Sequence, residues 1–211
     1  MTNTTSSALQ RTLKAHVDFF TAHAAQFRLL PSLLRLIARG KPVAPEELAS
    51  SSHYALNEIQ AWLHSSDAQL DQAGHLIGYG LSLLPTPHQF HLGEQALYAW
   101  CAFDTLIFPP LLKRSARVIS TCPVTGTEIR LTVTPEAIVD LSTASAALSI
   151  RLPGEDTNAC NLQEDICNAG FFFASRDVAS TQGFLHQGAV LLSVEEAAQV
   201  AREFARHILA L

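Results

Sequence analysis

The sequence lacks an apolar run long enough to cross a membrane. A spanning helix needs roughly 18 or more apolar residues in succession, and no stretch of this chain reaches that length. The polar residues Thr2–Ser7 precede a helical pattern with regular polar positions, so the start of the chain does not resemble a signal peptide. We therefore expect a cytoplasmic protein with no membrane partner.

A strong charge of either sign is also missing. The 14 Lys and Arg residues and 19 Asp and Glu residues give a net charge of -5, dispersed along the chain. Binding to nucleic acid needs a clustered basic surface, so a nucleic-acid partner is not expected. With 48% hydrophobic residues the chain can fill a sizeable core, which is typical of a compact globular protein.

Several catalytic motifs are absent. The nine histidines form no H-E-x-x-H pair, and the chain has no Gly-rich phosphate loop and no G-x-S-x-G element. Zinc-hydrolase, nucleotide-binding and serine-hydrolase functions therefore have no support. The four cysteines, at positions 101, 122, 160 and 167, form no C-x-x-C pair and no zinc-finger spacing. A chain of this size does not need disulfides, so we expect free thiols.

The fold class that we expect is α+β. Apolar periodicity and turn residues predict helices at residues 9–27, 29–39, 45–48 and 54–64, then a hairpin at 69–84. Helices followed by a hairpin are typical of a winged-helix-like domain, which we predict for residues 1–85. Pro85 and Pro87 fit neither a helix interior nor a central strand, and they mark the expected boundary with a second domain at residues 86–211.

The second domain is predicted to hold a mixed or antiparallel sheet with flanking helices. A helix is expected from Leu97 to Ile107, ending at Pro109-Pro110. Ser193 and Glu196 have the spacing of a capping box before a C-terminal helix. Runs of β-branched and aromatic residues predict strands at 117–121, 128–133, 147–152, 171–174 and 189–192.

Cys101, Asp104 and Cys167 are the candidate site residues. On a helical backbone Cys101 and Asp104 would stand three residues apart on one face, and their apolar surroundings would raise the carboxyl pKa toward a value useful for proton transfer. Cys167 precedes a predicted strand, where a loop enters rigid sheet. Two thiolates and a carboxylate would favour a soft, thiophilic ion. The alternative is that Cys101 is a small core residue and Asp104 a cap, since buried free cysteine is common.

The segment Leu97–Pro109, LYAWCAFDTLIFP, closely resembles the signature of the alkylmercury lyase family. The similarity continues through Thr121–Gly126 and Cys167–Ser175 and covers nearly the whole chain. The resemblance implies a winged-helix-like N-terminal domain and an alkylmercury lyase catalytic domain. It also implies that two cysteines and an aspartate, at the positions of Cys101, Cys167 and Asp104, bind the mercury of an organomercurial and cleave the carbon–mercury bond.

The resemblance also carries expectations about cofactors and partners. No organic cofactor or resident metal is expected, and Hg(II) is the product, which leaves to small thiols or a mercuric reductase. The chain departs from the family pattern at Asn168, where many members have a further cysteine, so a spare thiol is not expected beside Cys167. We interpret Cys122 and Cys160 as residues with structural or incidental roles.

Two other functions are compatible with a cysteine pair on such a scaffold. A metal-responsive winged-helix regulator would need basic residues in its recognition helix, but Ala55–His64 contains Glu58 and no Lys or Arg. A non-catalytic carrier of soft metals would need the two cysteines but not Asp104. The retained aspartate favours the enzyme.

Overall fold

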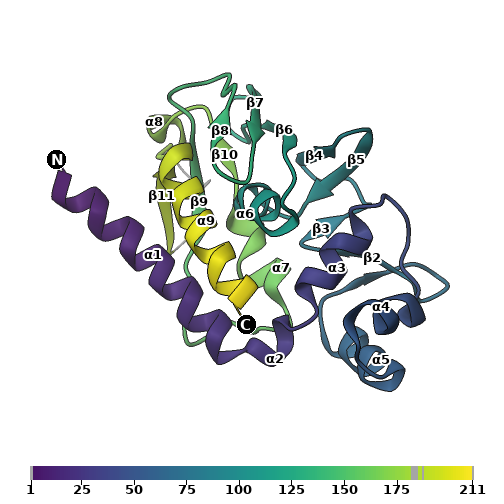
Figure 1. Cartoon of the computed structure of the whole chain (residues 1–211). Coiled ribbons are helices and arrows are strands. Elements are labelled where there is room, and N and C mark those ends of the chain that lie inside the picture. The colour runs from purple at the N-terminus through teal and green to yellow at the C-terminus, as the bar shows by residue number, and fades with distance from the viewer. Residues whose placement is uncertain (1, 182–184, 187, 211) are drawn as a thin grey trace.

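The computed structural model describes residues 2–181, 185–186 and 188–210, with side chains from residue 7 onward. Helices pack against two antiparallel sheets, one of eight strands and one of three (Figure 1). This agrees with the α+β class and the antiparallel sheet with flanking helices predicted from the sequence. None of the described helices is both long and apolar enough to span a membrane.

The first part of the chain is helical, as expected. Pro31 and Pro45 lie in the first turns of α3 and α4, where a missing backbone N–H costs nothing. His53 adopts a left-handed conformation that ends α4. The helices are α1 (Thr2–Ala22), α2 (Ala24–Phe27), α3 (Leu30–Ile37), α4 (Pro45–Ser52) and α5 (Leu56–Ser65).

The large sheet begins with the predicted hairpin and continues into the second half of the chain. Its strand order is β1-β2-β3-β5-β4-β6-β7-β8, and β3 pairs with β5 across the proposed boundary at residue 85. The domain boundary therefore stays a prediction. The strands are β1 (Gln69–Leu70), β2 (Leu76–Tyr79), β3 (Leu81–Ser82), β4 (His88–Leu92), β5 (Gln95–Ala99), β6 (Ala116–Thr121), β7 (Glu128–Val133) and β8 (Ile138–Val139).

The small sheet has β9 (Ala147–Arg151) between β10 (Phe172–Phe173) and β11 (Ala189–Ser193). The short helices α7 (Leu162–Asp165), η1 (Cys167–Ala169) and α8 (Arg176–Ala179) connect these strands. The predicted capping box is present, since Ser193 N–H donates to Glu196 and Glu196 N–H donates to the Ser193 hydroxyl. It starts α9 (Val194–Ala210), which lies against α1 and α6 (Figure 1).

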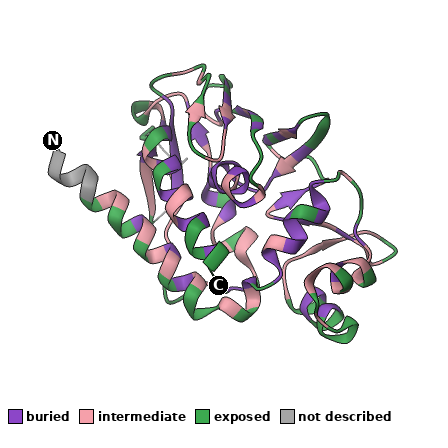
Figure 2. Cartoon of the chain, in the orientation of Figure 1, coloured by how far each residue is buried: buried purple, intermediate pink, exposed green. Residues whose placement is uncertain are grey.

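The central helix, α6 (Ala102–Leu112), differs from the predicted one. We expected a helix from Leu97, but Leu97 lies in β5, and the helix begins only after Cys101. The two prolines at 109 and 110 were expected to end the helix. They lie inside it instead, and the helix ends where the backbone N–H of Lys113 donates to their carbonyls. Figure 2 shows that α6 is buried along most of its length, so the core of the molecule surrounds it.

Candidate active site

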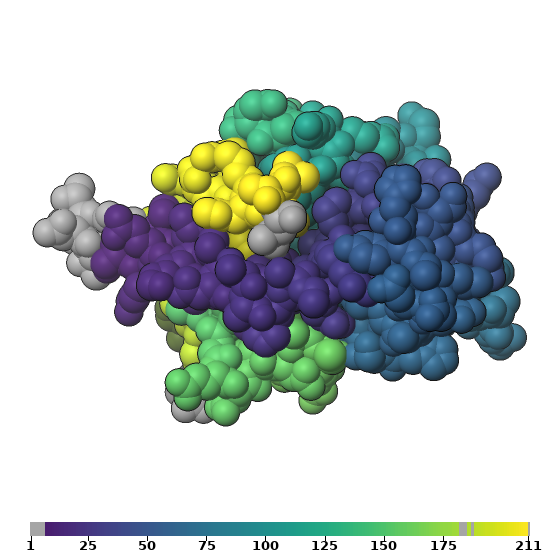
Figure 3. Space-filling model, turned by 60° about the horizontal axis from the view of Figure 1, so that its bottom comes forward, coloured from purple at the N-terminus to yellow at the C-terminus, as the bar shows by residue number. Residues whose placement is uncertain are grey.

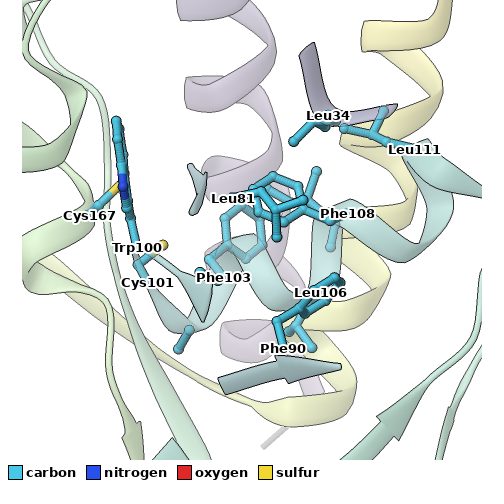
Figure 4. Close-up of a cluster of buried hydrophobic side chains, with 14 of the residues drawn as sticks. Leu34, Leu81, Phe90, Trp100, Cys101, Phe103, Leu106, Phe108, Leu111 and Cys167 are labelled. Carbon is cyan, nitrogen blue, oxygen red and sulfur yellow. The ribbon is translucent and has the colours of Figure 1, made fainter. Parts of the chain in front are cut away.

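The three candidate residues come together at the start of α6. One ligand atom from each of Cys101, Asp104 and Cys167 lies within 4.8 Å of the others. The Cys167 thiol lies 3.8 Å from Asp104 Oδ2 and is oriented to donate to it. Figure 4 shows the two cysteines at one edge of an apolar cluster that also holds Trp100 and Phe103. The three groups are thus close enough to hold a single soft ion.

The first two residues meet through a helix cap and not through a helical face. Cys101 is extended, with φ -141 and ψ 168, and occupies the N-cap of α6. Its backbone N–H donates to Asp104 Oδ2 at 3.2 Å, and the backbone N–H of Asp104 approaches the Cys101 sulfur at 3.4 Å. The expected convergence of thiol and carboxyl is present, but its cause is this reciprocal cap.

The backbone around Gly170 brings Cys167 up to the cap. The carbonyl of Gly170 accepts a hydrogen bond of 2.9 Å from the backbone N–H of Ala102. A Cβ atom on Gly170 would lie 2.7 Å from Cys101 Cβ and 3.2 Å from its sulfur. Only glycine allows the two segments to approach so closely.

Burial controls the protonation of the site. Loss of solvation raises the pKa of Asp104 to about 6, although hydrogen bonds from Cys101 and Cys167 partly oppose this rise. Burial also raises the pKa of Cys101, and the hydrogen bond to Cys101 together with burial raises the pKa of Cys167 well above its usual value. At neutral pH both thiols therefore carry their protons, and most of the Asp104 carboxyl is ionised.

Two small apolar cavities adjoin these groups. The first, which we call the thiol cavity, has a volume of about 80 Å³ and is lined by both cysteines and Asp104. The second, the tryptophan cavity, has a volume of about 60 Å³ and is lined by Trp100, Cys167 and Asp104. Phe20 and Leu162 line both cavities, so they form part of the wall between them.

Helix α1 contributes to the site although its sequence gave no such signal. His16 and Phe20 line the thiol cavity, and Figure 3 shows α1, in purple, lying along α9, in yellow. Burial lowers the pKa of His16 to about 4, so the imidazole is neutral. Phe20 stacks on Phe27 with ring centroids 3.7 Å apart. An apolar helical stripe predicts burial, but not which cavity it covers.

Asp67 is a second residue that the sequence did not indicate. It lies between α5 and β1 and accepts a 2.8 Å hydrogen bond from the backbone N–H of Gln163, just before Cys167 in the chain. Burial raises the pKa of Asp67. Its charge adds to the effect of burial on the pKa of Asp104. The carboxylate therefore joins the N-terminal helices to the segment that holds Cys167.

The other two cysteines lie apart from this site. Cys122 is 1% exposed in the turn between β6 and β7, where its N–H donates to Thr127. Cys160 is exposed. Neither belongs to the cluster of possible metal ligands found among the described residues.

Comparison with known proteins gives a consistent match. The family model for alkylmercury lyase matches residues 81–206. The chain belongs to the alkylmercury lyase family. An alkylmercury lyase of Staphylococcus epidermidis is 37% identical over 175 residues, which cover 82% of this chain and 80% of that protein. One from Streptomyces lividans is 36% identical over 209 residues, covering 97% and 95%.

A solved structure has the same fold. The crystal structure of the mercury-bound form of MerB2 superposes with a TM-score of 0.73 at 21% identity, covering 93% of this chain and 98% of that one. Cys101, Asp104 and Cys167 all lie within the part of the chain that matches the alkylmercury lyase family model.

Proposed function

We propose that this member of the alkylmercury lyase family cleaves the carbon–mercury bond of organomercurials, giving a hydrocarbon and Hg(II), as a step in mercury detoxification. The observation that carries the proposal is the convergence of two protonated thiols on a carboxyl with a pKa of about 6. Thiolate sulfur is the preferred ligand of soft ions, and a carboxyl with a pKa near neutrality can both take and give a proton.

The reaction begins with exchange of thiols on mercury. A substrate R–Hg–SR′ reacts with the Cys101 thiol: the mercury–sulfur bond to Cys101 forms, and R′SH leaves with the proton. The Cys167 thiol then gives its proton to Asp104, along the 3.8 Å contact between them, and its sulfur binds the mercury. Coordination to a metal favours loss of a thiol proton even where burial opposes it.

Bond cleavage follows from this proton transfer. Two sulfur ligands increase the electron density on mercury and on the carbon bound to it. Asp104 delivers the proton to that carbon, the bonding electron pair stays with carbon, and RH leaves. Hg(II) remains on Cys101 and Cys167. The apolar walls of the thiol and tryptophan cavities accommodate the organic group.

The product is removed by thiols from solution or by a mercuric reductase. Two external thiols return two protons to the cysteines and carry Hg(II) away, so the cycle needs no organic cofactor and no resident metal ion. We also propose that this occurs in the cytoplasm, where such thiols are abundant and stay reduced.

We further propose a winged-helix-like arrangement for residues 1–85 and a catalytic unit at 86–211. The succession of α3, α4, α5 and the β1–β2 hairpin supports the first of these. The arrangement would act as a support for the site, since Asp67 of this part holds the segment before Cys167.

The direct test is to incubate the reduced protein with phenylmercury and measure benzene by gas chromatography. Cys101→Ala and Cys167→Ala should each abolish release, because mercury loses one of its two sulfur ligands. Cys160→Ala is the matched control, since this cysteine is exposed and outside the cluster, and it should retain activity. Full activity in the Cys167 variant would rule out the two-thiol mechanism.

A further inference from the structure

One cationic residue lines the apolar thiol cavity. Arg151, the last residue of β9, lines this cavity together with Cys101 and Cys167. Among the described residues of the cavity wall it is the only Lys or Arg. The mechanism proposed above gives it no role.

The guanidinium has no ionic partner in the described part of the chain. The ion pairs found there do not include Arg151, and its side chain makes no hydrogen bond among those residues, Asp104 included. Arg151 is partly exposed, as are Leu162 and Ile166, which line the same cavity, so this side of it is accessible to solvent. A guanidinium there can bind a carboxylate with two parallel hydrogen bonds.

The rest of the cavity offers an anion no other positive charge. His16 is neutral at neutral pH because burial lowers its pKa to about 4. Ser149 donates its hydroxyl hydrogen to the carbonyl of Ala169 at 2.6 Å. Asp104 would repel an anion near the sulfurs. Among the described lining residues, Arg151 is therefore the one that can pair with the charge of an anionic molecule.

We propose that Arg151 and the thiol cavity form a binding site for the external thiol, and that they select thiols carrying a carboxylate. This rests on the proposed lyase function. The thiol's carboxylate pairs with Arg151 while its sulfur reaches the mercury held by Cys101 and Cys167. Two such thiols form two new mercury–sulfur bonds, the two bonds to the protein break, and each incoming S–H proton passes to a cysteine sulfur.

The test compares thiols of similar size and different charge in steady-state benzene release from phenylmercury. The probes are 3-mercaptopropionate, 2-mercaptoethanol and 2-aminoethanethiol. The measured quantity is the ratio of the rate constants for the anionic and the neutral thiol, compared between wild type and variant, so that the intrinsic reactivity of each thiol cancels. Arg151→Met, which keeps the apolar stem, should lower this ratio about fivefold to tenfold, the scale of one charge-assisted pair.

Further variants make the result specific. Arg151→Lys should restore much of the preference, and Arg151→Gln should behave like Arg151→Met if the charge and not the packing matters. Arg117→Met, an exposed arginine on β6, is the matched control and should leave the ratio unchanged. In the wild type, added sodium chloride should weaken the preference, because salt screens an accessible charge pair.

The outcomes separate this inference from the lyase function. If benzene is released in a single turnover but the ratio of the rate constants for anionic and neutral thiol is the same in wild type and in Arg151→Met, the role of Arg151 alone is overturned. No benzene with any thiol would overturn the lyase function itself.

Discussion

Replacing Asp104 by Asn should separate proton delivery from mercury binding. The amide oxygen can still accept the hydrogen bond from the backbone N–H of Cys101, so the cap of α6 should survive. The amide cannot take a proton from the Cys167 thiol and pass it to carbon. Removing a positioned general acid lowers a rate by about 10²-fold to 10⁴-fold, which is about 2.7–5.4 kcal/mol of transition-state stabilisation.

The assay compares two quantities in one sample. Mercury stoichiometry is measured by mass spectrometry, and benzene release in a single turnover is measured by gas chromatography. We expect Asp104→Asn to bind mercury at a stoichiometry near one and to release benzene at least about 10²-fold more slowly. Asp177→Asn, an exposed carboxyl on α8, is the matched control and should behave as wild type.

The pH dependence provides a second readout. Because the ionised Asp104 must take the thiol proton, kcat/KM of the wild type should fall as the pH drops below about 6. The Asn variant should lack this decline. Near-normal benzene release from the variant would refute the reasoning, since solvent would then supply the proton. Loss of mercury binding would show instead that the carboxylate is chiefly a ligand.

Three further variants test the packing around the site. Gly170→Ala should lose about 1–3 kcal/mol of unfolding free energy and most activity, because the new Cβ would lie 2.7 Å from Cys101 Cβ. In the control Gly154→Ala the new Cβ meets nothing within 4 Å, so stability and activity should stay as in the wild type. Phe20→Leu should open the wall between the two cavities and make room for a larger organic group. The ratio of kcat/KM for phenylmercury to kcat/KM for methylmercury should then rise by about threefold or more, and an unchanged ratio would contradict this. Burial lowers the pKa of His88 to about 4. The neutral His88 therefore stabilises the fold above the unfolded pKa of about 6.5, and this stabilisation is lost as the pH falls toward 4. The unfolding free energy of the wild type, measured in urea, should therefore drop between pH 7 and pH 5 by about 2 kcal/mol more than that of His88→Gln.

Local sequence signals predicted most elements but not the start of α6. Alternating and helical patterns located the strands β6, β7, β9 and β11 and the capping box of α9 because these depend on neighbouring residues alone. Leu97 and Trp100 fit a helical pattern equally well. Leu97 is extended because β5 pairs with β3 and β4, and the backbone N–H of Trp100 donates to the carbonyl of Gly80; a single sequence does not show this pairing.

The site was predictable in part for the same reason. Cys101 and Asp104 are three residues apart, so either a helical face or a cap would bring them together. Cys167 could be placed beside them only through the family resemblance, since its approach depends on the contact between Gly170 and Ala102. Phe20 reaches the site from α1 and Asp67 from the loop between α5 and β1, and neither has a local signal in the sequence.

The proposed mechanism requires the resting site and the mercury-bound site to differ in where the proton is held. In the free protein the thiols of Cys101 and Cys167 are protonated because burial disfavours two thiolates beside a carboxylate. In the mechanism proposed here, a bound Hg²⁺ centre would reverse this preference, since its positive charge would stabilise both thiolates and make the proton available to Asp104. The apolar surroundings thus keep the acid and the soft ligands inactive until the substrate itself supplies the charge that activates them.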